Sequence, residues 1–406
     1  MAPRLTIVLP LKGRHLFTLR FLWHANRARL PYRFLIADGQ VHPALAELLE
    51  NSGELFQNLD LQYIRYPDDR YFSCFFAKMA DALGRVTTPY AMLADNDDFL
   101  AFTGIECSLD FLESNPDYVC CGGGIAGFSV YSRNSDSFAG VLGRLNQLAY
   151  RYMPYDRSID FDSSSMTDRL LLGLRNSWSY YAVFRSPALM TIHREVAEMN
   201  LSDLQLHEKF YTMRALTLGK ARSDPSSIAY LRQYWTSSRS AFTKDWVHHL
   251  LRNRFSSDFA NIIDRISKLA ADADGVDQGA VAERLRERIE PWLRDFLRLN
   301  YGLSGTVRQY LRSRVPSVLI WLKTRRRYSL PFERRAILVK LRKDGASEDC
   351  VKAFSAELAQ IEDVVAGNTF RNFLRLHVSK LIPESPGEPN VGNAGLVESL
   401  GRGENA

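Results

Sequence analysis

Short apolar runs alternate with amphipathic stretches from the N-terminus to about Trp235. The runs LTIVLPL, YRFLIADG and LDLQYIRYP are rich in β-branched and aromatic residues, which is typical of buried strands. Apolar side chains recur every three or four residues from His15 to Ala28 and again in SCFFAKMADALGRV, and this spacing predicts two helices. Strands separated by helices of this length predict right-handed βαβ units and a mainly parallel sheet, the arrangement of an α/β fold.

The alternation continues through the middle of the chain. TTPYAMLADNDDFL predicts a fourth strand that runs into an acidic cluster, and DYVCCGG predicts another strand after a helix near Asp110. The polar stretch from Ser129 to Asp168 is too long for an ordinary connection, so we expect a functional loop region there. Three later segments predict strand and turn, then helix, then a last strand: RNSWSYYAVFRSPALM, LSDLQLHEKFYTMRALTLGK and AYLRQYW.

The pattern changes after Trp235. Residues 242–299 are rich in charge and periodic like helices. Between Arg308 and Lys343, twelve Lys and Arg residues accompany one acid, so the net positive charge of the chain is localised there. We therefore expect an α/β domain over residues 1–240, an α-helical region over residues 241–382 that contains the basic segment 308–343, and a disordered tail over residues 383–406.

Composition narrows the class of protein. A 46% hydrophobic fraction with 12% aromatic residues argues against wholesale disorder in a chain of 406 residues. No apolar run approaches the roughly 20 residues that cross a bilayer, and the N-terminus lacks the apolar core of a secretory signal. The five cysteines form no CxxC pair, which disfavours a disulfide framework or a zinc knuckle. We expect a cytoplasmic protein.

The strongest chemical signal is LADNDDFL, in which Asp95, Asp97 and Asp98 follow a buried strand. Carboxylates this close repel one another unless a cation or a basic partner is present. Hard oxygen ligands suit Mg²⁺ or Mn²⁺, and the carboxyl edge of a parallel sheet is where open α/β folds bind ligands. The alternative is an exposed acidic turn in which Asp98 caps the next helix.

Two weaker signals accompany the acidic cluster. Asp38 ends the second predicted strand in IADG, where a carboxylate can accept hydrogen bonds from a base or a ribose; the alternative is an ordinary Asp-Gly turn. The glycine run 122–124 follows a strand and would allow a sugar close to the backbone, or it is a simple loop. Arg185, Tyr180 and Tyr181 either contact substrate or belong to the core.

Taken together, TIVLPLKGR, FLIADG, TPYAMLADNDDFL and FLESNPDY with the following glycines resemble the GT-A nucleotide-sugar glycosyltransferases, in particular a bacterial family-2-like group. The resemblance covers roughly residues 5–235. It implies a Rossmann-like catalytic domain, a nucleotide-sugar donor (a UDP-sugar favoured) and a glycan or lipid-linked acceptor. It also implies a divalent metal, Mn²⁺ or Mg²⁺.

The resemblance also assigns individual residues. The metal would be held by two or three of Asp95, Asp97 and Asp98, and Glu208 would be the general base, with His207 and Asp203 as alternatives. The donor would be bound by Leu9, Pro10, Arg14, Asp38, Lys78, Asp95 and Asn96. With one base and no second carboxylate for a covalent intermediate, inversion is the economical mechanism. The alternative for Glu208 is a solvated helix face.

Other functions stay open at this point. RQYW at residues 232–235 only echoes the QxxRW signature of processive synthases, which favours non-processive transfer. A nucleotidyltransferase is disfavoured because only LKGR stands in for its Gly-rich basic loop, and a non-catalytic sugar- or membrane-binding protein is a further alternative. The basic segment 308–343 suits an anionic membrane surface at the inner face of the plasma membrane, or a solvated helical face. No module for nucleic acid accompanies it.

Overall fold

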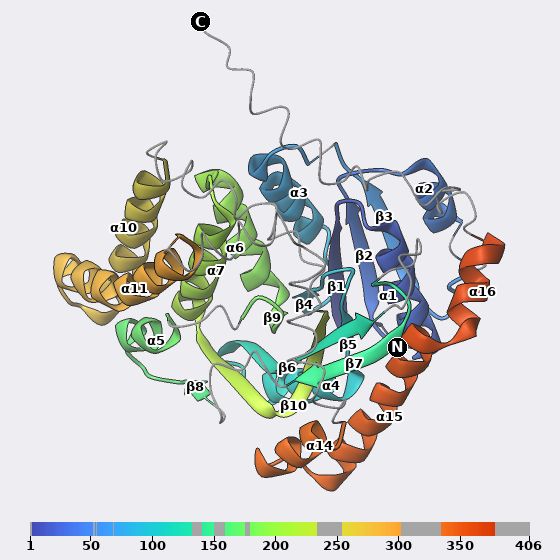
Figure 1. Ribbon diagram of the computed structural model, residues 1–406. Helices are drawn as coiled ribbons and strands as arrows, with labels where there is room; N and C mark the ends of the chain where they lie inside the picture. Colours follow the sequence, from blue (N-terminus) through green and yellow to red (C-terminus); the bar gives the residue numbers. More distant parts are fainter. Residues whose placement is uncertain are drawn as a thin grey trace, which may run out of the picture.

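The computed structural model describes residues 2–51, 53, 55–67, 69–131, 140–149, 159–174, 179–233, 254–301 and 334–377. These residues form one ten-stranded sheet with helices on both faces (Figure 1). Its main path has the order β3-β2-β1-β4-β9-β6-β10-β5, while β7 pairs with β6 and β8 with β10. The predicted α/β fold with a mainly parallel sheet and C-terminal helices is confirmed.

Six strands of the sheet run parallel: β1 (Leu5–Leu11), β2 (Arg33–Asp38), β3 (Asp60–Arg65), β4 (Tyr90–Leu93), β6 (Tyr118–Tyr131) and β10 (Lys220–Gln233). The other four run antiparallel to their neighbours: β5 (Phe99–Leu100), β7 (Arg144–Ala149), β8 (Ile159–Phe161) and β9 (Val183–Arg185). The parallel strands therefore share one carboxyl edge and one amino edge.

The first strand shows why its sequence is apolar throughout. Successive side chains of a strand point to opposite faces. In β1, Ile7 and Leu9 enter the core under α1 (His15–Arg27), α2 (Pro43–Glu50) and α4 (Phe102–Ser114), whereas Val8 enters the core on the other face. That second core lies under α3 (Phe72–Gly84), α6 (Ser186–Met199) and α7 (Leu204–Leu218). A sheet covered on both faces needs apolar residues at every strand position.

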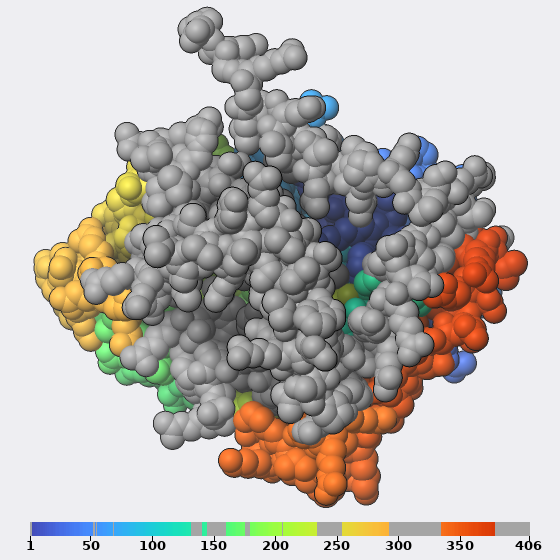
Figure 2. Space-filling model, in the orientation of Figure 1, coloured from blue at the N-terminus to red at the C-terminus, as the bar shows by residue number. Residues whose placement is uncertain are grey.

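The helices after residue 250 pack directly on this α/β body. One group, α10 (Arg254–Asp274) and α11 (Gln278–Tyr301), lies against α7 and α5 (Met166–Gly173). The other group comprises α14 (Arg334–Lys343), α15 (Glu348–Ala366) and α16 (Asn368–His377), and it covers α1, α4 and β7. The Phe373 ring of α16 lies 4.4 Å from the Trp23 ring of α1. The two groups form opposite flanks of the molecule (Figures 1 and 2).

Part of the basic segment is seen in α14. Ile337 and Leu341 are buried against α15, and Arg342 pairs with Glu348 at 2.6 Å. Residues 334–343 therefore form a packed helix with a charged outer face, while residues 302–333 lie outside the described part of the chain. The predicted boundary near residue 240 and the tail from Pro383 also lie outside it. No helix among the described residues has the length and apolarity to span a membrane.

Local details differ from the sequence predictions at three places. The segment TTPYAMLADNDDFL is two strands, β4 and β5, that pair with different partners on either side of the acidic turn. RSPALM begins α6 at Ser186 rather than continuing a turn, with a proline in the first turn. The glycine run 122–124 lies inside β6, where a Cβ on Gly123 would stand 2.7 Å from the Ala229 Cβ. Glycine is needed there for packing against β10 and not for a loop.

Candidate functional site

The acidic cluster lies at a topological switch point of the sheet. β1 is placed between β2 and β4, so the chain leaves β1 to one side and returns to the other. Open α/β folds bind ligands in the crevice outside the carboxyl ends of such strands. The turn that carries Asp95, Asp97 and Asp98 connects β4 to β5 at this edge of the sheet, directly across from the turn that follows β1.

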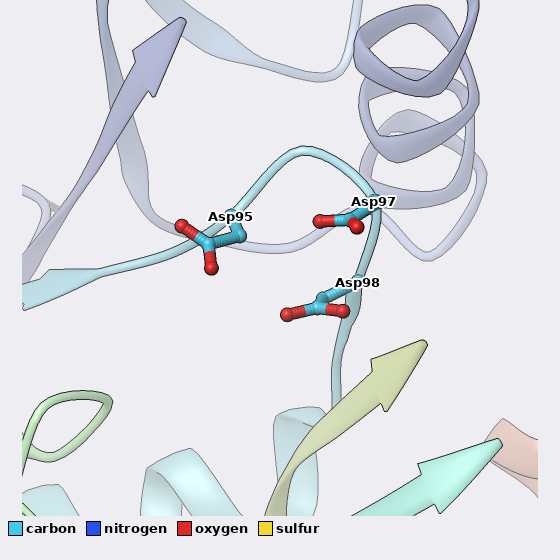
Figure 3. Close-up of side chains that lie close together, drawn as sticks. All are labelled: Asp95, Asp97 and Asp98. Atoms are coloured by element: carbon cyan, nitrogen blue, oxygen red, sulfur yellow. The ribbon is translucent and has the colours of Figure 1, made fainter. Parts of the chain in front are cut away.

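The three carboxylates converge. Each offers an oxygen within 4.8 Å of the others, and Asp97 and Asp98 point back across the turn toward Asp95 (Figure 3). The cluster is not an exposed acidic turn, because Asp97 is 5% and Asp98 1% exposed. Asp98 also does not cap α4, whose N-cap residue is Ala101. The alternative of a solvated capping turn is therefore wrong.

The electrostatics of the cluster favour an added cation. Burial and the charge of Asp97 raise the pKa of Asp95, and burial with the charges of Asp97 and Asp95 raises the pKa of Asp98 well above its ordinary value. The Asp98 Oδ1 atom accepts a hydrogen bond from the backbone N–H of Gln233 at 2.6 Å, whereas Oδ2 has no partner among the described residues. An all-carboxylate donor set with a buried free oxygen fits a hard divalent cation such as Mg²⁺ or Mn²⁺.

The first helix holds Asp97 in place. Arg14 Nη1 lies 2.7 Å from Asp97 Oδ2, and Arg20 donates to the Asp97 carbonyl oxygen. Gly13 and Arg14 both have positive φ, 67° and 58°, so the loop between β1 and α1 turns sharply toward the acidic turn. A non-glycine residue in this region is uncommon and is often found at functional sites. Burial lowers the pKa of Arg20 to about 10, although Asp97 and Asp98 oppose this shift.

Asn96 fastens the acidic turn to the same loop. Its Nδ2 atom donates to Thr18 Oγ1 at 2.9 Å and approaches the carbonyl oxygens of Gly13 and Arg14 at 3.5 and 3.4 Å. The side chain, 6% exposed, thus connects β1, α1 and the turn after β4. The predicted role of Asn96 in binding the donor stays a prediction.

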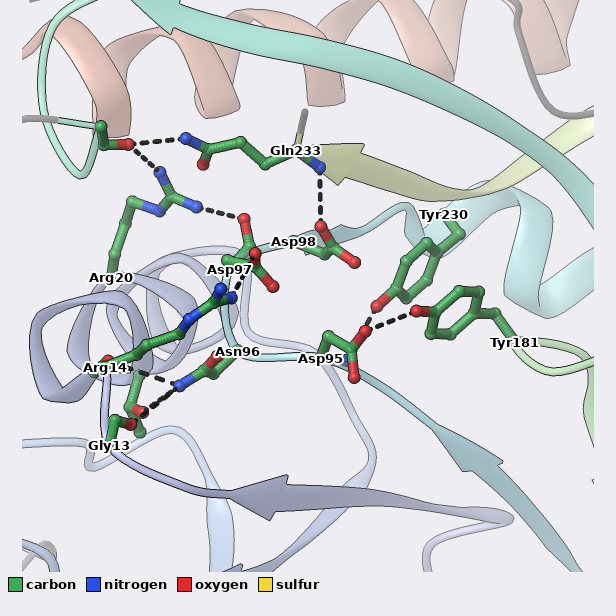
Figure 4. A network of polar contacts seen from close by, with 12 residues as sticks. Gly13, Arg14, Arg20, Asp95, Asn96, Asp97, Asp98, Tyr181, Tyr230 and Gln233 are labelled. Atoms are coloured by element: carbon green, nitrogen blue, oxygen red, sulfur yellow. Dashed lines mark hydrogen bonds and ion pairs between the residues drawn. The ribbon is translucent and has the colours of Figure 1, made fainter. Parts of the chain in front are cut away.

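Two stacked tyrosines hold Asp95 on the other side (Figure 4). The Tyr181 hydroxyl donates to Asp95 Oδ2 at 2.5 Å, and the Asp95 amide donates to the Tyr230 hydroxyl at 2.8 Å. The two rings are 4.1 Å apart and nearly parallel. Tyr181 therefore belongs to the site, whereas Arg185 lies at the amino edge with its guanidinium on the carbonyls of Leu112, Asn115 and Tyr118.

Asp38 lies at the carboxyl end of β2 and is 1% exposed. Its two oxygens accept from the Gln40 amide at 3.0 Å and from the Tyr63 hydroxyl at 2.7 Å. The following Gly39 has a role that its motif did not indicate, since a Cβ there would lie 2.2 Å from the Asp69 carboxylate. The Asp-Gly pair therefore serves a close approach as well as a turn.

Lys78 of α3 is buried under the same edge. Its ammonium forms an ion pair with Asp69 and donates to the Leu11 carbonyl at 3.1 Å. Leu9 is fully buried within β1, and Pro10 next to it is partly buried opposite Ala37. These residues lie at or beside the carboxyl end of β1, and their predicted contacts with a nucleotide stay predictions.

The predicted base lies on α7. Glu208 is partly buried. Its neighbour His207 is fully buried against the rings of Phe76 and Tyr180 and is inaccessible to an acceptor. Asp203 accepts from the Leu206 amide at 3.0 Å and so stabilises the first turn of α7. Of the three candidates, Glu208 alone is left with a partly exposed side chain.

Sequence reasoning missed several residues of the site. Arg20 stands out in the sequence only as a cation on the apolar face of α1, while Tyr230, Arg232 and Gln233 end the last strand of the domain. The guanidinium of Arg232 lies 5.8 Å from the centre of the Tyr181 ring, and its charge partly opposes the rise in the pKa values of Asp95 and Asp98. The predicted last strand, AYLRQYW, is the signal in the sequence for these residues.

The described residues also include a cavity of about 510 Å³ at the opposite, amino edge. It is lined by Arg185, Asp117, three prolines and apolar side chains. Arg185 is occupied by backbone carbonyls, and Asp117 pairs with Lys220 at 2.7 Å. Its charged groups are thus already matched, whereas in the acidic cluster the Oδ2 atom of Asp98 has no partner among the described residues.

No family model and no curated protein matches this chain. Among solved structures it is similar to TarS of S. aureus, residues 1–349, at 12% identity and a TM-score of 0.45, over 95% of this chain and 98% of that one. TarS has also been solved with UDP and with UDP-GlcNAc. The mannosyltransferase PcManGT of Pyrobaculum calidifontis, in complex with GDP-Man and Mn²⁺, is 12% identical over 85% of this chain and 87% of that one, with a TM-score of 0.38. Because these TM-scores lie below 0.5, we derive the function from the site itself.

Proposed function

We propose that this protein is a metal-dependent glycosyltransferase that moves a sugar from a nucleoside diphosphate to a glycan or a lipid-linked acceptor. The observation that carries the proposal is the convergence of Asp95, Asp97 and Asp98 at the β1/β4 switch point. The buried Asp97 and Asp98 and the partly buried Asp95 bring three carboxylates together, and burial raises the pKa values of Asp95 and Asp98. Such a cluster calls for a cation, and a diphosphate is a ligand that such a cation would bind. The resemblance of residues 5–235 to nucleotide-sugar glycosyltransferases supports the same function.

Each predicted site residue would have its own role in binding the cation or the donor. Asp95, Asp97 and Asp98 would hold the divalent cation, which supplies Lewis-acid neutralisation of the charge that develops on the leaving diphosphate. Arg14, whose side chain is 28% exposed and lies beside Asp97, would approach the same phosphates. Asp38 at the end of β2 would bind the base or ribose, which we expect to belong to a uridine nucleotide. Leu9, Pro10, Lys78 and Asn96 would complete the donor site.

Transfer needs a group that takes the proton of the acceptor hydroxyl. We assign this role to Glu208, because a carboxylate within about 3 Å of the hydroxyl can act as general base in direct displacement. A single base predicts inversion at the anomeric carbon. The sequence has no QxxRW signature of processive synthases, which RQYW at residues 232–235 only echoes, and this favours non-processive transfer. A nucleotidyltransferase remains the alternative enzyme, and a sugar-binding protein without turnover remains the alternative of another class.

The test uses the full chain and a panel of UDP, GDP and their sugar derivatives, each with and without Mn²⁺. We expect one base to raise the melting temperature only when Mn²⁺ is present, since ligand at 100 times its Kd stabilises the native state by about 2.7 kcal/mol. We also expect slow release of nucleoside diphosphate from the matching donor. Asp97→Ala should remove both effects, and Asp110→Ala, at the amino edge, should keep both.

Each outcome separates the candidates. If no nucleotide of the panel raises the melting temperature, the proposed function is overturned. A shift without any release of nucleoside diphosphate points to a binding protein, and release of pyrophosphate from a nucleoside triphosphate and a sugar phosphate points to a nucleotidyltransferase.

A further inference from the structure

Arg20 of α1 carries a charge in the interior of the protein. The residue is 0% exposed, and arginine is almost never fully buried unless its charge is compensated. It lies between the acidic turn after β4 and the segment that begins at Gly140, two parts of the chain that are far apart in sequence. Its position in α1, whose N-cap residue is Arg14, places it next to the proposed metal site.

The acceptors of Arg20 are backbone carbonyls rather than carboxylates. Nη2 donates to the Asp97 carbonyl at 2.5 Å, and Nη1 donates to the carbonyls of Val141 at 3.2 Å and Gly140 at 3.3 Å. The guanidinium also lies over the Phe99 ring at 4.7 Å and the Phe17 ring at 5.0 Å. Carbonyl acceptors fix the path of the backbone while leaving the positive charge free to act on nearby carboxylates.

The contacts of Arg20 close into a ring. The side-chain Nε2 of Gln233 donates to the same Gly140 carbonyl at 2.7 Å, and the backbone N–H of Gln233 donates to Asp98 Oδ1 at 2.6 Å. The ring therefore runs from Asp97 through Arg20, Gly140 and Gln233 to Asp98 (Figure 4). The ring begins and ends in the acidic turn, so the same set of hydrogen bonds holds the backbone of Asp97 and the side chain of Asp98.

We propose that Arg20 is a positioning residue of the divalent-cation site, which through this ring holds Asp97 and Asp98 in the orientation that binds the cation. The proposal rests on the metal site of the proposed function. Three like charges within 4.8 Å repel one another, and carboxylate ligands need to be held within about 0.5 Å of a productive geometry. Groups that orient metal ligands from behind are worth about 10-fold to 100-fold in metal affinity.

The protein offers a matched control in Arg169 of α5. It is 8% exposed, and its guanidinium donates to the carbonyls of Leu216, Ser163 and Ser164 at 3.1, 2.6 and 3.3 Å. Like Arg20, it therefore holds three backbone carbonyls from a buried position, but none of them belongs to the acidic turn. A merely structural role for Arg20 would make the two arginines equivalent.

The test compares Arg20→Met, Arg20→Lys and Arg169→Met in the full chain. Mn²⁺ affinity is measured by electron paramagnetic resonance at a temperature where circular dichroism shows each variant folded. We expect Arg20→Met to weaken Mn²⁺ binding by about 10-fold or more. Arg20→Lys keeps the positive charge but not the planar guanidinium, so its Mn²⁺ affinity should lie between those of the wild type and Arg20→Met. The Mn²⁺ affinity of Arg169→Met should stay within about 2-fold of the wild type. Gln233→Leu, which opens the ring at Gly140 and keeps Arg20, gives a second reading if Arg20→Met does not fold.

Amide hydrogen exchange of the metal-free proteins provides the second readout. We expect faster exchange at residues 95–98 and at Gln233 in Arg20→Met, and not in Arg169→Met. Unchanged Mn²⁺ affinity together with unchanged exchange would overturn the proposal. If the wild type itself binds no Mn²⁺, the metal site of the proposed function fails, and exchange alone then decides: faster exchange confined to the turn supports the ring, and unchanged exchange overturns it.

Discussion

The two edges of the sheet carry charge in opposite ways. At the amino edge, Arg4 before β1 contacts three acids of α4: Glu106, Glu113 at 3.0 Å and Asp110 at 3.3 Å. Arg185 on the same edge is held by three carbonyls at the end of α4 and the start of β6. Every one of these charges has a partner of opposite sign or a set of acceptors.

At the carboxyl edge, like charges are gathered and buried instead. Burial and the neighbouring carboxylates raise the pKa values of Asp95 and Asp98, and one oxygen of Asp98 has no partner among the described residues. A fold gains nothing in stability from burying repelling carboxylates. Matched charge at the amino edge therefore marks structure, and the excess of acidic charge around the Arg14–Asp97 ion pair at the carboxyl edge marks a place where a cation completes the protein.

The largest expected effect comes from removing one charge of the cluster without changing its shape. Asp98→Asn keeps an oxygen for the Gln233 amide, so the turn should keep its conformation. We expect metal-dependent donor turnover to fall by about 10³-fold, the scale of losing a preorganised electrostatic group. The metal-free melting temperature should stay equal or rise, because burial already disfavours the Asp98 anion.

The amino edge supplies the control for this substitution. Asp110→Asn removes an acid whose side chain is 68% exposed, and we expect turnover and melting temperature to stay at wild-type values. Turnover is measured as released nucleoside diphosphate, and stability by thermal denaturation. Equal losses in the two variants would remove the distinction between the edges.

A smaller effect is expected from a hydroxyl behind the cluster. Tyr181→Phe deletes the hydrogen bond to Asp95 and keeps the stack on Tyr230. We expect Mn²⁺ affinity to fall by about 10-fold and the free energy of unfolding to fall by about 1 kcal/mol. Tyr32→Phe deletes an equivalent bond, to Glu106 at 2.9 Å, at the amino edge. Tyr32→Phe should lower the free energy of unfolding by a similar amount and leave Mn²⁺ affinity unchanged. A change in Mn²⁺ affinity would show that the amino edge also supports the cation site.

Most of the fold could be predicted because it depends on local pattern. Continuous apolar runs gave β1, β2 and β3, and apolar spacing gave α1, α3 and α7, because a strand covered on both faces and a helix with one buried face leave different periods in the sequence. The acidic cluster was predictable for the same reason, since its three carboxylates lie within four positions.

The remainder of the site could not be predicted because its contacts join distant parts of the chain. Tyr181 and Tyr230 reach Asp95 only after β9 and β10 are placed in the sheet. Arg20 reaches Gly140 only because α1 packs beneath that segment. Gly39 looked like a turn residue, and the Asp69 side chain that requires it lies thirty positions further on. Such pairings are set by topology rather than by local pattern.

The α6–α7 core tests whether any polar mismatch marks a ligand site. His193 and His207 are fully buried, and their ring nitrogens have no partner among the described residues, but the rings are neutral. Burial lowers the pKa of His207 to about 3. The unfolded chain takes up a proton at about pH 6.5 and the folded chain does not. Its contribution to stability is therefore present above pH 6.5 and is lost as the pH falls toward 3.

We expect this histidine to remove about 2 kcal/mol of unfolding free energy between pH 7 and pH 5. His207→Phe should abolish that share of the loss, because it places an apolar ring beside Phe76 and Tyr180. Urea denaturation of both proteins at the two pH values measures the difference, and Mn²⁺ affinity at pH 7 is the control. An affinity change would mean that this core belongs to the site, and an unchanged pH dependence would mean that His207 is solvated.

The smallest effect is expected at the matched edge itself. Arg4→Met breaks contacts with Glu106, Asp110 and Glu113, whose side chains are 25%, 68% and 44% exposed, while that of Arg4 is 38% exposed. Solvent screens charges at such positions, so we expect a loss of at most about 1 kcal/mol in the free energy of unfolding. The loss should shrink in high salt, because screening at about 1 M shortens the Debye length to about 3 Å. Urea denaturation at low and high salt measures it, alongside Mn²⁺ affinity, which should not change. A fall in Mn²⁺ affinity would show that charge at the amino edge also supports the cation site, and the contrast between structural and functional charge would then fail.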